Sequence, residues 1–327
     1  MSKIMQGVDC GDNVKEIICD GNCKVFKMEN ETGEGVMTAY EVFPGAIVMF
    51  NDFHMSYCKS KFHAKDVEIF CIDHCREGSM EYEQNNKYCY YFEAGDLVVD
   101  NRRNHAGHIE YPLKHFHGIS IGFYLPYAEE QLPKEFKDFS VTLRSLQEKF
   151  CKKSHYVIKA NEEIEHIFSQ LYRVPIKIKQ DYFRVKIFEL LLYLDALEVD
   201  EQKEEKPYFY KSQVEKIKVI QELMTKDLTQ HYTIEELAGR FELSQTSLKN
   251  CFKAVYGSSI NRYMQTYRMN AATTLLLRER DKSVAEIAGI VGYDSPSKFA
   301  AVFKKMIGVT PLDYRKNFQK YDNGGVE

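Results

Sequence analysis

A short segment from Gln245 to Lys253 carries side chains that can recognise the edges of DNA bases. Glutamine and asparagine amides can each form two hydrogen bonds with adenine, and the ammonium group of lysine can donate to guanine, each contact adding about 1–3 kcal/mol of discrimination. In a helix, the apolar residues Leu248, Cys251 and Phe252 predict a buried side. Five side chains remain on the exposed side: Gln245, Thr246, Lys249, Asn250 and Lys253.

A second segment, beginning at Ser297, has a similar buried side and a different exposed side. Its buried positions are predicted by helical spacing: Phe299, Val302, Phe303 and Met306. The small or basic side chains that remain for DNA are Ser297, Lys298, Ala300, Ala301, Lys304 and Lys305. Lysines of this kind suit contacts with backbone phosphates.

Two copies of one helical unit must position these faces. Thr233-Ile-Glu-Glu236 and Ser283-Val-Ala-Glu286 are capping boxes, in which a hydroxyl and a carboxylate satisfy free backbone N–H groups at a helix start. Gly257 and Gly308 stand where a helix ends in the left-handed conformation. The copies align at an offset of 50 residues over the first helix and 51 over the second, so the turn absorbs one residue. Each copy predicts a helix-turn-helix, whose second helix can enter a major groove.

The repeat region is basic, whereas the rest of the chain is acidic. Residues 211–327 hold 18 Lys+Arg and 13 Asp+Glu, a net charge of +5 that leaves −9 for the remainder. This asymmetry favours a polyanionic partner for the second region alone. A helical pattern from about Ser259 to Leu277 joins the two copies and, if rigid, places their second helices about 10 bp apart on double-stranded DNA. The alternative is a helical interaction bundle with a solvated basic face.

The run from Ile287-Ala-Gly-Ile-Val-Gly-Tyr293 through Ser295-Pro-Ser-Lys-Phe299 to Thr310-Pro-Leu-Asp-Tyr-Arg315 strongly resembles the signature of AraC-type transcription regulators. The first copy resembles the same family at Leu237-Ala238, Ser244, Leu248, Phe252-Lys253, Gly257 and Tyr267-Arg268-Met269. The resemblance implies a DNA-binding regulator, usually an activator that recruits RNA polymerase, and not an enzyme. It also implies an N-terminal sensing or dimerisation domain, often a cupin-like β-barrel followed by helices.

Ala301 departs from the family pattern, in which many members have a long polar or basic side chain at this position. We therefore expect the first copy to specify the DNA sequence. The second copy is expected mainly to position the protein through phosphate contacts.

The chain is predicted to be a two-domain α+β protein. Residues 1–197 form an expected effector-sensing and dimerisation domain, in which short apolar or alternating segments make residues 1–125 typical of a β-sandwich or barrel. Residues 133–197 have helical periodicity. A charged linker at 198–212 precedes the double helix-turn-helix domain at 213–320.

The last helix of the first domain carries a short heptad seam. Its apolar residues are spaced alternately four and three apart: Phe183, Ile187, Leu190, Leu194 and Leu197. Two explanations fit this pattern. The helix packs on its own barrel, or it forms the contact of a homodimer.

Histidines and cysteines of the first domain raise the question of a metal site. His115-Phe-His117 could chelate from one face of a strand, but the expected downstream carboxylate is missing. Cys71-Ile-Asp-His-Cys75 lacks the Cys-x-x-Cys spacing of zinc sites. The sequence therefore predicts no metal site and no cofactor, and it offers no catalytic residues. The rival function is a cupin-type metal-binding enzyme or sensor tethered to DNA.

Aromatic residues are plentiful in the first domain, including Phe50, Phe53 and Phe92. They predict either barrel core or a pocket for a small-molecule effector. The DNA-binding half is similar to siderophore-responsive regulators, which makes a ferric siderophore one candidate effector.

The sequence shows no run near the roughly 18 apolar residues of a membrane span and no apolar stretch of a signal peptide in its first twenty residues. Nine cysteines without such a signal favour reduced thiols. We expect a cytoplasmic protein that contacts no membrane.

Overall fold

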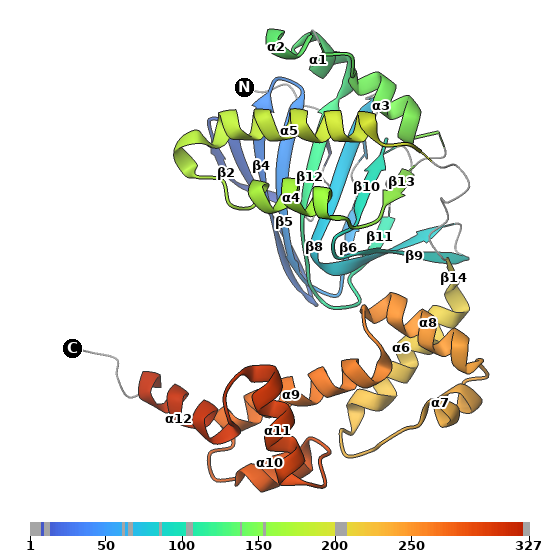
Figure 1. Cartoon of the computed structure of the whole chain (residues 1–327), viewed down its shortest axis with the longest axis vertical. Coiled ribbons are helices and arrows are strands. Elements are labelled where there is room, and N and C mark those ends of the chain that lie inside the picture. Colours follow the sequence, from blue (N-terminus) through green and yellow to red (C-terminus); the bar gives the residue numbers. More distant parts are fainter. Residues whose placement is uncertain are drawn as a thin grey trace. The chain divides into compact units, whose positions relative to one another are not determined.

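The computed structural model describes residues 8–9, 14–60, 63–64, 68–84, 87–102, 107–137, 139–152, 155–199 and 208–322. The chain divides into two compact units, Met1–Phe209 and Tyr210–Glu327 (Figure 1). The boundary falls in the predicted linker at 198–212, of which residues 200–207 lie outside the described residues. Within the described part of the chain, every helix is too short or too polar to cross a membrane.

The first unit is built on an antiparallel sheet. Its main strands, in spatial order, are β13 (His155–Ile158), β10 (Leu97–Asp100), β8 (Ile69–Gln84), β12 (Phe116–Tyr124), β5 (Ala46–His54), β4 (Gly33–Phe43), β3 (Cys23–Asn30) and β2 (Val14–Asp20). Shorter strands extend it or pair beside it: β1 (Val8–Asp9), β6 (Tyr57–Ser60), β7 (His63–Ala64), β9 (Tyr88–Glu93), β11 (Gly107–Glu110) and β14 (Phe209–Tyr210). The β-rich start predicted for this domain is confirmed.

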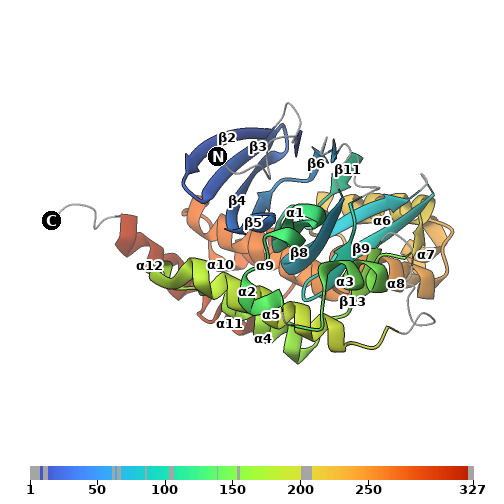
Figure 2. The same ribbon diagram turned by 90° about the horizontal axis from the view of Figure 1, so that it is seen from above.

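Helices cover one face of this sheet, as Figures 1 and 2 show. They are α1 (Leu125–Glu130), α2 (Lys134–Lys137), α3 (Leu143–Phe150), α4 (Glu162–Leu171) and α5 (Lys179–Ala196), with a short 3-10 helix at Ile176–Ile178 before α5. Between sheet and helices lies a core that includes Ile119 and Ile121 of β12 and Phe168 of α4. The burial of these apolar side chains is the main force that holds the helices on the sheet.

The heptad seam of α5 faces this core. Phe183, Ile187, Leu190 and Leu194 are fully buried, and Leu197 packs against the same cluster. Packing of the helix on its own barrel therefore accounts for the heptad spacing. These side chains are not available to a second copy in this fold, and the exposed side of α5 instead carries Val185 and Leu192.

The other face of the sheet has a second core. Phe53 and Phe92 are buried there with Tyr111 and Phe116, and the rings of Phe53 and Tyr111 are stacked with centroids 5.5 Å apart. Two of the aromatic residues considered for a pocket thus serve as core.

His74 of β8 is a polar residue inside the helix-covered core. Its ring stacks on Phe168 with centroids 4.1 Å apart, and it is 2% exposed. Burial lowers the pKa of His74 to about 4, because the charged imidazolium would lose its hydration. Unfolding lets the His74 ring take up a proton in mild acid. The first unit therefore loses stability as the pH falls below the usual pKa of histidine.

In the described part of the second unit, the regular secondary structure is all helical apart from Tyr210 at its start. Its helices are α6 (Lys211–Lys226), α7 (Ile234–Arg240), α8 (Gln245–Tyr256), α9 (Ile260–Arg278), α10 (Val284–Ile290), α11 (Pro296–Ile307) and α12 (Pro311–Asp322). The prediction of an all-helical second domain with two helix-turn-helix units is confirmed.

Candidate nucleic-acid interface

Matching caps start the first helix of each helix-turn-helix unit. At α7, the hydroxyl of Thr233 accepts from the Glu236 backbone N at 3.1 Å, and the Glu236 carboxylate accepts from the Thr233 backbone N at 2.7 Å. At α10, Ser283 and Glu286 form the same two bonds at 3.1 and 2.7 Å. Both predicted capping boxes are present. They fix where the first helix of each unit begins.

The second helices also begin and end alike. Ser244 caps α8 and Ser295 caps α11, each accepting from a backbone N–H in the first turn. Gly257 and Gly308 end them with φ of 69° and 90°, the left-handed conformation that favours glycine. Residues 241–244 link the first pair of helices and 291–295 the second. The change of offset therefore falls in the turn, as the sequence predicts.

Helix α8 separates a buried side from an exposed side. Leu248, Cys251 and Phe252 are fully buried, as predicted. The five side chains proposed to contact DNA are all exposed: Gln245, Thr246, Lys249, Asn250 and Lys253. The structure thus leaves this polar face accessible to a groove.

Helix α11 is similar on its buried side with one exception. Phe299 and Phe303 are fully buried and Val302 is half-buried. Met306 was expected in the core, but it is 38% exposed. The two phenylalanines already pack with Met269, Ala272 and Leu276 of α9, so Met306 is left at the rim of a cleft. The other proposed contacts, Ser297, Lys298, Ala301, Lys304 and Lys305, are exposed, and Ala300 is half-buried.

Helix α9 is the shared support of the two units. Tyr263, near its start, packs on Phe252 and Tyr256 of α8 with ring centroids 5.4 and 4.9 Å away. Met269, further along, joins the core of α10 and α11. One helix, α9, therefore supports the second helix of each helix-turn-helix unit.

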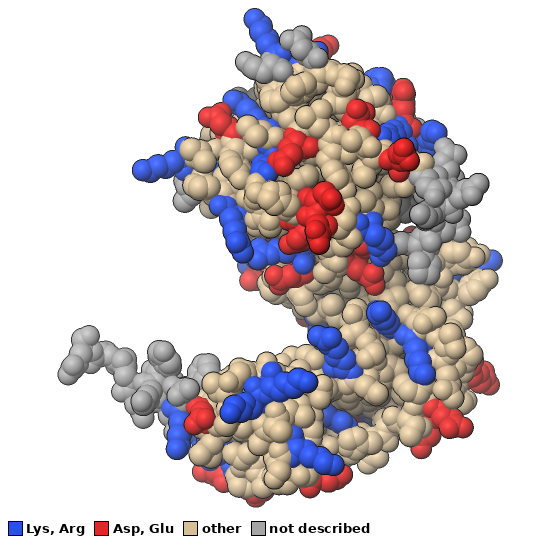
Figure 3. All heavy atoms as spheres, viewed as in Figure 1, with Lys and Arg blue, Asp and Glu red and all other residues tan. Residues whose placement is uncertain are grey.

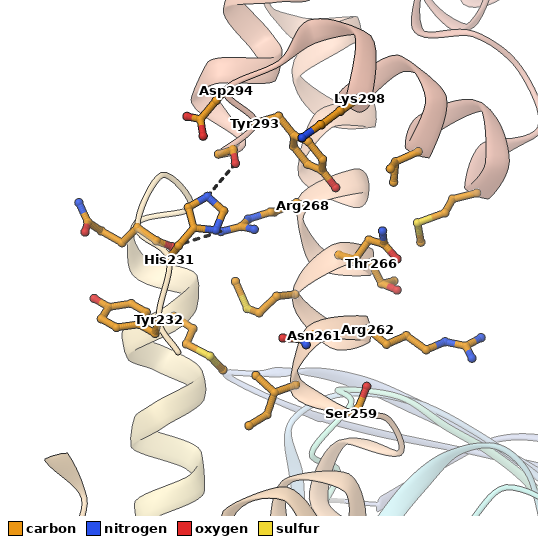
Figure 4. A pocket seen from close by; sticks show the side chains of 18 of the residues that line it. His231, Tyr232, Ser259, Asn261, Arg262, Thr266, Arg268, Tyr293, Asp294 and Lys298 are labelled. Carbon is orange, nitrogen blue, oxygen red and sulfur yellow. Dashed lines mark hydrogen bonds between the residues drawn. The ribbon is translucent and has the colours of Figure 1, made fainter. Parts of the chain in front are cut away.

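A polar clip ties the α6–α7 loop to the second turn. Arg268 of α9 donates from Nη2 to the carbonyl oxygens of Leu228 at 2.9 Å and Gln230 at 3.2 Å. Nε2 of His231 lies 2.9 Å from the carbonyl oxygen of Gly292 (Figure 4). A Cβ at Gly292 would lie 1.9 Å from the Leu228 carbonyl oxygen, so only glycine permits this approach. The clip restrains the two helix-turn-helix units relative to each other.

Beside the clip is a cleft of about 980 Å³ between α9, α11 and the α6–α7 loop. Arg262, Thr266 and Lys298 are among its lining residues and are labelled in Figure 4. Neither Arg262 nor Thr266 is among the DNA contacts that the sequence predicts. Since both lie on the exposed side of α9, their periodicity within that helix could have marked them.

Basic side chains spread over one face of the second unit. Figure 3 shows several of them across this face, with the acidic side chains toward its edges. Such a distribution produces the positive potential that attracts a phosphate backbone.

Comparison with known proteins identifies this region. A family model described as a helix-turn-helix domain matches residues 237–317. The HTH-type transcriptional activator RhaR of Mannheimia succiniciproducens is 31% identical over 120 residues, which are 37% of this chain and 42% of that protein. An AraC-like transcription regulator of Streptomyces antibioticus is 36% identical over 92 residues, 28% of this chain and 30% of that protein.

Among solved structures, the C-terminal domain of AraT, a response regulator from Geobacillus stearothermophilus, is 31% identical with a TM-score of 0.30. The match covers 31% of this chain and 84% of that one. The chain spans less than half the length of the curated relatives it matches. Both of these curated relatives are named as transcription regulators. The second unit thus contains a helix-turn-helix domain that is similar to those of AraC-like transcription regulators.

Proposed function

We propose that the protein is a sequence-specific DNA-binding transcription activator that inserts α8 and α11 into successive major-groove segments of its operator. The observation that carries this proposal is the pair of equally capped helices on one supporting rod, each with an exposed polar face. The clip formed by Arg268 and His231 supports a fixed spacing between them. Helices so arranged suit two grooves about one turn of DNA apart.

The two helices divide the work of recognition. Helix α8 offers Gln245 and Asn250, whose amides pair with adenine, and Lys249, which donates to guanine. Helix α11 offers Lys298, Lys304 and Lys305 around the short side chain of Ala301. We assign base recognition to α8 and phosphate contacts mainly to α11.

A small-molecule effector bound in the first unit controls presentation of the DNA-binding unit in this proposal. Buried polar atoms support this location, namely both ring nitrogens of His74 and the hydroxyl of Tyr172, which have no hydrogen-bond partner among the described residues. Their rings lie 6.2 Å apart between sheet and helices. Buried polar atoms of this kind call for a partner such as a ligand or water. Because coupling is reciprocal, DNA changes effector affinity by the same factor.

A homodimer that recruits RNA polymerase completes the proposal. A second copy would meet the exposed side of α5, where Val185 is 60% and Leu192 41% exposed and the two are seven residues apart. Val185→Glu is expected to convert the dimer to a monomer in sedimentation equilibrium without loss of helical circular dichroism. A dimer of unchanged affinity would contradict this interface.

Selection of binding sites from random duplex DNA by the full-length protein tests the DNA-binding proposal. We expect enrichment of one motif at near-physiological salt, present twice if the dimer forms, and loss of its specificity in the double variant Gln245→Ala, Asn250→Ala. Binding to random duplex at low salt is the second readout, because the phosphate contribution needs no specific sequence. A protein that neither enriches a motif nor binds duplex at low salt overturns the proposal.

A further inference from the structure

We propose that Asp52, His54 and His117 form a site for a divalent transition-metal ion, for which Zn²⁺ is the probe. The site lies on the sheet of the first unit. The sequence predicts no metal site, and the histidine pair that it offers as chelators is His115 with His117. The structure instead places two residues of β5 beside His117, and Nδ1 of His115 is 2.9 Å from the Leu113 carbonyl oxygen.

Strand register brings the three side chains together. His117 of β12 and Asp52 of β5 are direct partners in the antiparallel pair. His54 lies two residues after Asp52, so it points from the same face of β5. Neighbouring residues on opposite strands have their Cβ atoms within about 5.5 Å. The backbone therefore preorganises the cluster without help from a loop.

The three ligand atoms form a triangle of the size a metal ion requires. Nε2 of His54 is 2.9 Å and Nε2 of His117 is 3.1 Å from Oδ1 of Asp52, and the two nitrogens are 3.3 Å apart. An ion with bonds of about 2.0–2.1 Å holds its ligand atoms about 2.9–3.4 Å apart, in octahedral to tetrahedral geometry. Both imidazoles thus present the same nitrogen to one point.

A second carboxylate supports the orientation of His117. Glu77 of β8 is the partner of His117 on its other side, and its Oε2 lies 3.6 Å from Nδ1. Metal-binding histidines commonly have a carboxylate at the ring nitrogen that does not bind the ion, which orients the ring and raises its basicity. Glu77 also lies 3.5 Å from Nε of Arg76, whose guanidinium covers the ring of Tyr172. Through Arg76, Glu77 is therefore linked to Tyr172 at the end of α4.

The chemistry of the set suits a first-row transition metal. Two imidazoles and one carboxylate are a ligand set of zinc and of non-haem iron, and three protein ligands leave positions for water. The side chains of Asp52 and His54 are 60% exposed and that of His117 is 31% exposed. An ion can thus enter the folded protein directly.

Titration of the untagged, chelator-stripped full-length protein with Zn²⁺, in competition with a chromophoric chelator, tests the site. We expect one ion per chain and a loss of affinity of at least 100-fold in His54→Gln and His117→Gln. Glu77→Gln is expected to lose about 10–100-fold, because it removes only the orienting carboxylate. Circular dichroism and thermal unfolding of each stripped variant verify that the fold is intact.

His108→Gln is the matched control. His108 is also exposed beside a carboxylate, with Nε2 3.2 Å from Glu110 Oε1, but it is not part of the three-ligand cluster. Its variant is expected to bind Zn²⁺ as the wild type does. Equal affinities in the wild type, His54→Gln and His117→Gln, or no binding above the level of His117→Gln in the wild type, overturn the proposal.

Discussion

The two helix-turn-helix units share their caps and the buried side chains of their second helices, but they differ on the faces exposed to solvent. Phe252 of α8 and Phe303 of α11 occupy equivalent positions and are both fully buried. Lys249 and Asn250 on α8 correspond to Ala300 and Ala301 on α11. The scaffold is thus repeated while the exposed face of its second helix is not, as the proposed division of DNA recognition between α8 and α11 requires.

A second difference lies in the turn. Glu242 and Gly292 are equivalent residues, and both have positive φ, at 52° and 83°. The side chain of Glu242 is 89% exposed, so the first turn has room for it. The second turn meets the backbone of the α6–α7 loop and has none. The same backbone conformation is therefore tolerant in one unit and restrictive in the other.

The largest expected effect tests whether the two helix-turn-helix units depend equally on their buried phenylalanines. Phe252→Ala and Phe303→Ala should each lower the free energy of unfolding by about 3–5 kcal/mol, because each removes a fully buried ring. Urea denaturation followed by circular dichroism measures both. The exposed neighbours Lys253 and Lys304, changed to Ala, are the controls and should stay within about 0.5 kcal/mol of the wild type. A cost below 1 kcal/mol in either phenylalanine variant would show that the units are not equivalent in packing.

The turn provides the next largest effect. Gly292→Ala should destabilise the second helix-turn-helix unit by about 3 kcal/mol, since it combines left-handed strain with a clash against the Leu228 carbonyl. Glu242→Gly should stay within about 1 kcal/mol of the wild type, because relief of strain is offset by added freedom of the unfolded chain. Thermal unfolding compares the two. Similar costs for both changes would mean that the contact between loop and turn is unimportant.

Local patterns in the sequence predict much of the second unit. The capping boxes and the terminal glycines involve residues three or four apart or a single backbone conformation, so their residue types suffice. The extra residue between Ile290 and Pro296 also follows from alignment of the two copies. The exposed face of α8 follows from helical periodicity, because its buried side is continuous.

Contacts between distant segments are not encoded in such patterns. The heptad of α5 shows that one side is apolar but not which surface covers it. The clip of Arg268 depends on a loop about 40 residues away, and Asp52 meets His117 only through strand register. Met306 likewise has core spacing, yet the phenylalanines beside it fill the available groove. Each case requires knowledge of tertiary packing.

Recognition of DNA should separate the two exposed faces. On the selected operator, Asn250→Ala should lose about 1–3 kcal/mol of discrimination at one base pair. Lys304→Ala should weaken binding to all sequences alike and reduce the slope of log affinity against log salt by about one. Fluorescence anisotropy at several salt concentrations measures both quantities. An unchanged salt slope in Lys304→Ala would contradict the phosphate contact.

The capping boxes give the smallest and finest comparison. The backbone hydrogen bond from Thr233 lowers the pKa of Glu236, and that from Ser283 lowers the pKa of Glu286, with a further contribution from the charge of Lys282. Since each folded pKa lies below the unfolded one, each carboxylate stabilises its unit above its usual pKa of about 4.3. That stabilisation is lost as the pH falls through the folded value. Glu236→Gln and Glu286→Gln should therefore flatten the acid side of the stability profile.

The salt dependence of stability, measured across the same pH range, distinguishes the carboxylates of Glu236 and Glu286. Only Glu286 has an adjacent lysine among the causes of its lowered pKa. The effect of Glu286→Gln should therefore shrink in high salt more than that of Glu236→Gln, because the capping-box hydrogen bonds act at short range and are screened less. Lys282→Gln is the control, because it should abolish the salt-dependent part and leave the capping box intact. If both glutamate variants respond equally to salt, the lysine has no role and the two caps are equivalent in their electrostatics as well as in their geometry.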